Sequence, residues 1–155
     1  MSGPLTSIAV PLRGLTDKVV IVVGGASGLG AATAFRLGKE GSRVVVGDIA
    51  EEAAHETADR IVTAGGTATA VGFDLANSES VGELVRSAAT AFAGVDAMFN
   101  VGADMRALGS DTDVVDIDLD IWDRVMAVNL RGYVVAMKLA IPRMLERVAG
   151  GLFAL

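Results

Sequence analysis

The sequence has no cysteine, and this absence excludes disulfide bonds, thiolate catalysis and zinc sites built from cysteine. Its single histidine, His55, falls on the polar face of an expected helix and is expected to contact solvent, so it offers no general base. Basic residues are scattered, and 13 of them stand against 19 acidic residues, for a net charge of −6. Nucleic-acid binding draws on clustered Lys and Arg, so this balance argues against DNA or RNA as a partner.

Long apolar runs and targeting signals are also missing. No uninterrupted apolar run reaches the ~18 to 20 residues that span a membrane, because charged residues and glycine break each one. Residues 1–15 lack the basic segment and apolar core of a signal peptide. We therefore expect a cytoplasmic protein without membrane contact, in which a loose tail, residues 1–15, precedes a single domain, residues 16–155.

The residues that are abundant indicate a fold class. Hydrophobic residues make up 52% of the chain but aromatic residues only 5%. Ala, Val and Leu supply most of this content, as in α/β proteins whose parallel strands are covered on both faces. The 155 residues are enough for one ordinary domain with one sizeable core.

One stretch near the N-terminus predicts a buried strand, a tight turn and the start of a helix. Residues 19–23 are a β-branched run, which suits a strand buried on both faces. Gly24, Gly28 and Gly30 follow, where glycine lets the backbone turn sharply, admit a ligand and pack a helix against the strand. The free N–H groups of that helix, near Ser27, would favour an anion such as a diphosphate. Taken alone, the pattern also fits a purely structural turn.

Four expected strands alternate with helices along the chain, at residues 19–23, 43–47, 67–72 and 95–99. Apolar positions at helical spacing mark the three helices between them: Leu29, Thr33 and Leu37; then Ala54, Thr57, Ala58 and Ile61; then Val81, Leu84, Val85, Ala88 and Phe92. Right-handed crossovers then require a doubly wound parallel sheet in the order 3-2-1-4, with helices on both faces. The order reverses between the first and fourth strands, and open α/β sheets bind ligands in the crevice at that point.

An acidic connection, residues 102–118, invites comparison with a metal site. Asp116, Asp118 and Asp120 imitate the opening of a calcium loop, but Ile121 stands where that loop needs glycine and Ala127 where it needs glutamate. We therefore predict no metal site, and expect these aspartates to cap a helix or contact solvent.

A single long helix is predicted from residue 120 to about residue 147. Asn129 lies on its apolar stripe, so the amide must find hydrogen-bond partners or take part in chemistry. Pro142 should bend this helix, and residues 152–155 read as the start of a fifth strand. The apolar stripe comprises Trp122, Val125, Met126, Tyr133, Met137, Ala140 and Met144.

Together these marks resemble the short-chain dehydrogenase/reductase family of single-domain Rossmann oxidoreductases. The marks occur in the family's order and cover nearly the whole chain. The resemblance implies a domain that binds NAD(H) for hydride transfer to or from an alcohol or ketone. The marks are Gly24-x-x-x-Gly28-x-Gly30, then Asp48, then Asp74-Leu75, then Asn100, and finally Trp-Asp-Arg-Val-Met-Ala-Val-Asn-Leu-Arg-Gly at 122–132.

The resemblance also implies a role for each matching residue. Asn129 would complete a catalytic tetrad by holding a water of the proton relay. Asp48 would repel the 2′-phosphate of NADP, and no adjacent Lys or Arg would neutralise it, so NAD is the expected cofactor. The cofactor-binding residues would be Gly24, Ser27, Gly28, Leu29 and Gly30 at the diphosphate, Asp48 with the neighbouring Ile49 at the ribose, Asp74 and Leu75 at the adenine, and Asn100 and Gly102 along the adenosine.

Two positions depart from the family pattern. Val23 stands where the family usually has Thr, and residues 100–103 read Asn-Val-Gly-Ala in place of Asn-Asn-Ala-Gly. Both departures fall around the expected adenosine pocket, so we expect reduced affinity for the cofactor on an intact fold.

The family's catalytic Ser and Tyr-x-x-x-Lys have no counterpart in the 155 residues. Tyr133 and Lys138 are five residues apart, so they do not share a helix face as that pair requires. We expect a Rossmann domain incomplete at its C-terminus that binds dinucleotide weakly and catalyses nothing alone. Two alternatives stay open: a non-enzymatic nucleotide-binding or interaction module, and half of a split enzyme completed by another chain.

The apolar stripe of the 120–147 helix predicts association. In the family, later elements would cover this stripe, so here we expect self-association or a completing chain. Trp122, Tyr133, Met137 and Met144 should lie in a subunit contact or in an exposed apolar patch.

Overall fold

The structure is a computed structural model that describes residues 14–109 and 113–147. Residues 1–13 of the expected 1–15 tail, and the expected fifth strand over 152–155, lie outside the described residues. The elements, in chain order, are β1 Val19–Val23, α1 Gly28–Lys39, β2 Arg43–Asp48, α2 Glu51–Thr63, β3 Thr67–Gly72, α3 Ser78–Phe92, β4 Ala97–Asn100, a 3-10 helix Arg106–Gly109, α4 Leu119–Met126, a π-helical segment Ala127–Gly132 and α5 Tyr133–Glu146.

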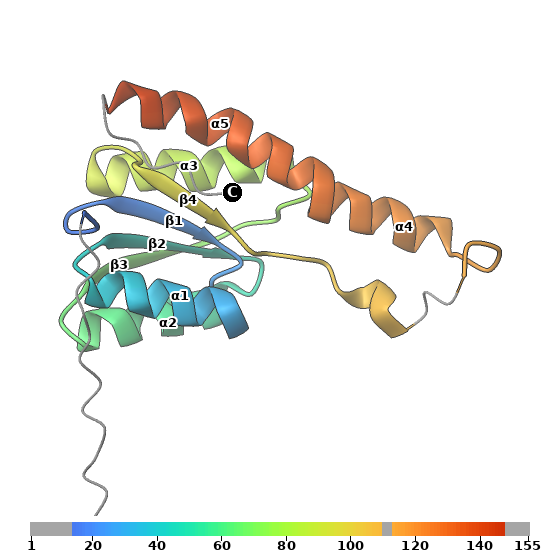
Figure 1. Ribbon diagram of the computed structural model, residues 1–155, viewed down its shortest axis with the longest axis horizontal. Coiled ribbons are helices and arrows are strands. Elements are labelled where there is room, and N and C mark those ends of the chain that lie inside the picture. Colours follow the sequence, from blue (N-terminus) through green and yellow to red (C-terminus); the bar gives the residue numbers. More distant parts are fainter. Residues whose placement is uncertain (1–13, 110–112, 148–155) are drawn as a thin grey trace, which may run out of the picture.

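The four strands form one parallel sheet in the order β3-β2-β1-β4, which confirms the predicted topology (Figure 1). Val19 of β1 pairs with Arg43 of β2, and Val20 pairs with Ala97 of β4. All five residues of β1 are buried, as the β-branched run predicted. The reversal between β1 and β4 places a switch point above the carboxyl end of β1.

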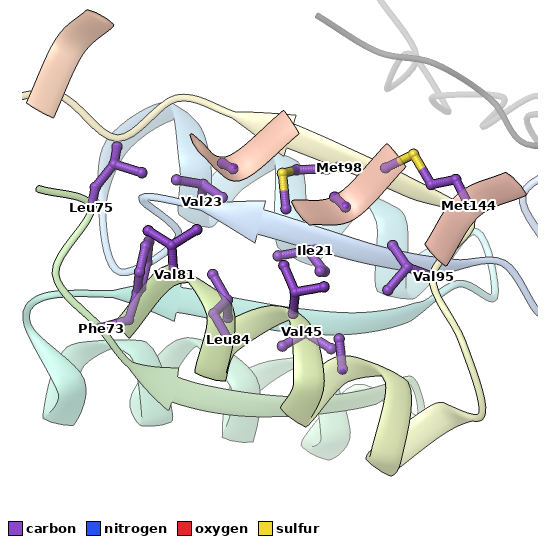
Figure 2. Packing of buried hydrophobic residues seen from close by; sticks show 14 of the residues in the cluster. Ile21, Val23, Val45, Phe73, Leu75, Val81, Leu84, Val95, Met98 and Met144 are labelled. Atoms are coloured by element: carbon purple, nitrogen blue, oxygen red, sulfur yellow. The ribbon is translucent and has the colours of Figure 1, made fainter. Parts of the chain in front are cut away.

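Helices cover both faces of this sheet and divide the core in two. Figure 1 shows α1 and α2 on one face and α3 and α5 on the other. Successive strand residues point to opposite faces, so Ile21 packs with α3 and α5 whereas its neighbour Val22 packs with α1 and α2. Figure 2 shows the first of these clusters, in which Ile21 and Val45 of the sheet lie beside Leu84 of α3.

The helix predicted from the spacing of Leu29, Thr33 and Leu37 is present as α1, and small residues form its most deeply buried face. Leu29 is 66% exposed, and Gly30, Ala34 and Gly38 are the buried residues of this helix. A Cβ atom on Gly38 would lie 2.4 Å from Ile61 Cγ2 of α2. The close approach of α1 to α2 selects small residues at these positions. Leu37, from the predicted spacing, is partly buried and packs against the same core.

The predicted long helix is continuous from Leu119 to Glu146, but its middle is π-helical. A π turn accommodates one extra residue and commonly lies at a functional site. Gly132 is the last residue of this segment and packs closely against the loop after β3. A Cβ atom at this position would lie 2.6 Å from the Leu75 carbonyl oxygen, so the packing requires glycine. In Figure 1, α5 lies along α3, whereas α4 extends past the carboxyl ends of the strands.

The same helix is, by length and composition alone, able to cross a membrane. It has 28 residues, and its most apolar 18-residue window has a mean hydropathy of 1.3. Arg131 and Lys138 interrupt its apolar residues, which is why the search for uninterrupted runs predicted no such segment. The inner face of α5 packs on the sheet. Because a core helix passes the same test, this is weak evidence for a membrane span.

The sequence predicted four exposed apolar side chains on this helix; Trp122 is exposed, at 46%, but Met144 is not. Met144 is only 5% exposed and belongs to the core, so its place in the predicted patch was wrong. Tyr133 is half-buried and packs against the same core. The error arose because α3 covers this side of α5. Besides Trp122, the exposed apolar residues of the helix are Leu119, Leu130, Val134, Ile141 and Leu145.

Aspartate capping, predicted for the acidic connection, is confirmed at α4. Asp118 Oδ1 accepts hydrogen bonds from the backbone N–H groups of Asp120 and Ile121, at 2.9 and 3.2 Å. Asp113 accepts similar bonds from residues 115 and 116. Within residues 14–109 and 113–147, no group of three or more acidic or histidine side chains has the arrangement of a metal site.

Candidate functional site

A pocket of about 720 Å³ lies above the carboxyl ends of the strands, at the predicted switch point. It brings together ten of the eleven residues expected to bind a cofactor, all except Asn100; Asn129 is also absent from its walls. The pocket walls comprise Val23, Gly24, Ser27, Gly28, Leu29, Gly30, Asp48, Ile49, Phe73, Asp74, Leu75, Val101, Gly102, Ala103, Asp104, Met105, Arg106, Arg124 and Val128.

The glycine turn between β1 and α1 is shaped by close backbone contacts. Gly24 has a φ of +85°, and a Cβ atom on it would lie 2.4 Å from the Gly102 Cα. A Cβ atom on Gly30 would lie 1.9 Å from the Gly24 carbonyl oxygen. By contrast, the Cβ position of Gly28 faces open space. Ser27 makes no side-chain capping bond to α1, so the N-terminus of this helix can present N–H groups to an anion.

Asp48, at the end of β2, is held by two backbone groups. Its Oδ2 accepts a hydrogen bond from the Ala26 N–H at 3.0 Å, and its Oδ1 accepts one from the Ala50 N–H at 3.0 Å. The carboxylate therefore ties β2 to the glycine turn, a structural role that the sequence did not reveal. Each oxygen retains a second lone pair, so the same carboxylate can also accept bonds from ligand hydroxyl groups.

Asp74 also lines the pocket, in the loop after β3. Its backbone N–H donates to Ser80 Oγ at 3.0 Å, and its Oδ1 accepts from the Ala76 N–H at 2.8 Å. The other carboxylate oxygen, Oδ2, lies 3.5 Å from Arg124 Nη1. Asp74 is thus fixed on one side, while its second oxygen faces an arginine across the pocket mouth.

The long helix holds the loop after β4 through two side chains. Asn129, in the π-helical segment, accepts a bond from the Asp104 N–H at 2.7 Å and donates to the Asp104 carbonyl at 3.0 Å. The Tyr133 hydroxyl donates to the Gly102 carbonyl at 2.7 Å. Burial raises the pKa of Tyr133, which keeps the hydroxyl protonated and able to make this bond.

Two arginines of the pocket wall, Arg106 and Arg124, were not predicted as site residues. Arg106 forms an ion pair with both oxygens of Asp104, and Arg124 Nε lies 3.4 Å from the same carboxylate. The hydrogen bonds from Arg106 outweigh the opposing effect of burial and hold the pKa of Asp104 far below its usual range. Sequence spacing could not pair these residues, because Asp104 and Arg124 are 20 positions apart.

Asn100 lies at the end of β4, below the pocket. Its Oδ1 is the one buried side-chain oxygen or nitrogen without a hydrogen-bond partner among the described residues. A buried polar atom without a partner costs stability, so this oxygen is available to accept a hydrogen bond.

A family model described as short chain dehydrogenase matches residues 18–153 of the chain, which is most of its length. The chain belongs to the short-chain dehydrogenase family. The Rossmann-type fold, the parallel order β3-β2-β1-β4 and the oxidoreductase resemblance drawn from the sequence agree with this membership.

Individual relatives support the same assignment. The chain is 37% identical over 135 residues to a probable short-chain type dehydrogenase/reductase of Bradyrhizobium diazoefficiens, covering 87% of this chain and 48% of that protein. It is 33% identical to a 2,5-dichloro-2,5-cyclohexadiene-1,4-diol dehydrogenase of Sphingobium indicum, covering 85% and 51% respectively. A solved structure of a Serratia marcescens short-chain dehydrogenase/reductase mutant superposes with a TM-score of 0.78 at 33% identity, covering 84% of this chain and 52% of that one. The chain thus spans about half the length of these relatives.

The one tyrosine of this sequence, Tyr133, makes a structural hydrogen bond. The Tyr133 hydroxyl donates its hydrogen bond to the Gly102 carbonyl, and Lys138 is exposed on α5. The two are five residues apart, as noted from the sequence. Tyr133 is therefore a structural contact between the helix and the β4 loop, and no proton donor for a substrate is assigned to it.

Proposed function

We propose that this short-chain dehydrogenase domain binds NAD(H), with the diphosphate at the N-terminus of α1 and the adenosine ribose at Asp48. The observation that carries the proposal is the position of the Asp48 carboxylate in the pocket wall, beside the glycine turn. A carboxylate there accepts bonds from ribose hydroxyls and repels a 2′-phosphate. The pocket wall's two arginines are both paired with Asp104, so neither is free to neutralise that phosphate.

The residues present fit a dinucleotide. Gly24 and Gly30 leave no room for side chains where the turn closes, and Gly28 leaves space open where a diphosphate would approach. Ile49, 67% exposed beside Asp48, offers an apolar surface to a nucleoside. Leu75 and Gly102 bound the adenosine side in this proposal, whereas Asn100 lies outside the pocket wall.

In the whole protein we propose hydride transfer between the nicotinamide and an alcohol or ketone. The nicotinamide, when bound, accepts or donates the hydride. The residues of this chain hold the cofactor and exclude water from one side of it. Asn129 in this proposal supports the site by fixing the loop after β4, and it has no proton of suitable pKa to deliver to a substrate. We propose a cytoplasmic enzyme that associates through the exposed side of the 119–146 helix.

Thermal unfolding with and without millimolar NAD tests the binding directly. We expect NAD to raise the melting temperature of the wild type, and Asp48→Asn to reduce this shift while keeping one acceptor oxygen for the backbone. Asp59→Asn, on the exposed side of α2, is the matched control and should leave the shift unchanged.

An assay of NADH formation by the same 155-residue polypeptide distinguishes a domain that only binds NAD from an active enzyme. We expect no NADH formation with a panel of alcohols, because the sole tyrosine is engaged by Gly102. NADH formation would mean that another group donates and accepts the proton. A melting temperature that NAD does not change would contradict the proposed binding.

A further inference from the structure

Arg124 connects two loops that the sheet places on different walls of the pocket. It lies in α4, and its guanidinium reaches Asp74 in the loop after β3 and Asp104 in the loop after β4, at 3.5 and 3.4 Å. All three residues line the pocket. A residue that contacts both walls can set the position of one against the other.

Asp104 is the fixed end of this connection. Its side chain is only 7% exposed and pairs with Arg106 through both carboxylate oxygens. Its backbone is held on both its N–H and its carbonyl by the Asn129 side chain. Arg124 therefore extends from an anchored carboxylate, and its guanidinium has less freedom than that of an isolated surface arginine.

Asp74 is the adjustable end. Its Oδ1 is occupied by the Ala76 N–H, whereas its Oδ2 meets only the outer nitrogen of Arg124 at 3.5 Å. Its side chain is 36% exposed, so Oδ2 has space to accept a bond from a ligand donor in the pocket. The guanidinium of Arg124 thus lies within reach of both carboxylates, that of Asp74 and that of Asp104.

We propose that Arg124 is a positioning residue for base recognition: it holds the Asp74 carboxylate in place, so that Oδ2 accepts a hydrogen bond from the exocyclic amine of a bound purine. This inference rests on the proposed NAD binding. Beyond that binding, we infer that selectivity for an amino-purine over an oxo-purine depends on Arg124 of α4. Arg124 acts on the base indirectly, by holding Asp74.

The test compares two ligands that differ only at this amine, NAD and nicotinamide hypoxanthine dinucleotide, by titration calorimetry. The wild type should bind NAD about five- to tenfold more tightly, as expected for one hydrogen bond to a charged group. Arg124→Met should reduce this ratio to within about twofold, and Arg124→Lys should restore part of it. Arg131→Met, in the neighbouring exposed π-helical position, should keep the wild-type ratio.

A double-mutant cycle makes the mechanism specific. Asp74→Asn should lose the selectivity, and adding Arg124→Met to it should change the ratio no further, because both residues act on the same bond. Loss of folding would lower affinity for both ligands together, so the ratio and the Arg124→Lys variant keep the test decisive. An Arg124→Met variant that keeps the full wild-type ratio overturns the inference, as does a wild type that binds both ligands equally. A wild type that binds neither ligand overturns the proposed function itself.

Discussion

The side chain of Asn129 exchanges two hydrogen bonds with the backbone of Asp104, at 2.7 Å from the Asp104 N–H and 3.0 Å to its carbonyl. An asparagine amide matches a backbone peptide group in its donor and acceptor, so one residue can satisfy both. This pair joins the π-helical segment to the loop after β4, which forms part of the pocket wall. The amide on the apolar stripe is thereby satisfied, as the cost of burying it requires.

Replacing Asn129 by Ala should lower the free energy of unfolding by about 1–3 kcal/mol, because two partly buried backbone groups lose their partners. Urea unfolding measures this change. Leu130→Ala, at the exposed neighbouring position, is the control and should change stability by less than about 0.5 kcal/mol. Equal stability of the two variants would show that Asn129 does not hold the loop.

Gly30→Ala should lower the free energy of unfolding by about 2–4 kcal/mol, because the new Cβ atom meets the Gly24 carbonyl and the backbone must shift. The variant should also lose the NAD-dependent rise in melting temperature. Gly109→Ala is the matched control, since a Cβ atom there meets nothing within 4 Å. A Gly30→Ala variant with the wild-type free energy of unfolding and the wild-type NAD-dependent melting shift would show that this close contact in the glycine turn does not exist.

The topology could be predicted from the sequence because β-branched runs and helical spacings are local signals, and right-handed crossovers convert their order into 3-2-1-4. Ten expected pocket residues could be located because each lies at the carboxyl end of a strand, in the loop just after it, or at the start of a helix. Arg106 and Arg124 were missed because their roles depend on loops that only the tertiary structure brings together. The π-helical segment was missed because helical periodicity does not register one inserted residue.

Asp96, at the opposite end of the sheet from the pocket, should contribute to acid sensitivity. Burial raises its pKa, but the hydrogen bond from the Val19 N–H and the charges of Arg147 and Lys18 outweigh this, so its pKa is lowered from 3.8. A lowered folded-state pKa means that the stabilisation is present above the unfolded-state value and is lost as pH falls through the folded-state value. Urea unfolding between pH 7 and pH 3 should therefore show a loss of stability below about pH 4.

Asp96→Asn isolates this contribution. It should lower stability at pH 7 and make the remaining stability depend less on pH in the acid range. Asp59→Asn on exposed α2 should keep the wild-type profile. A profile for Asp96→Asn that parallels the wild type would assign the acid sensitivity to other carboxylates.

If the protein associates through the long helix, as we propose, one charged substitution on that helix should lower the molecular mass of the assembly. Val134→Asp places a carboxylate on the exposed apolar side of α5 and should convert an oligomer to a monomer in light scattering. Val62→Asp on α2 is a matched control, because the two valines are 54% and 52% exposed. A wild type that is monomeric at all concentrations, or an unchanged mass in Val134→Asp, would contradict this interface.

Titration calorimetry with NAD and with NADP tests the central claim most directly, because Asp48 distinguishes the two cofactors by charge at one ribose oxygen. We expect NAD to bind with a dissociation constant at least about tenfold lower than that of NADP. The Asp48→Asn variant should narrow this difference. Binding of NADP as tight as or tighter than that of NAD, or no heat of binding with either dinucleotide, would contradict the assignment of this pocket.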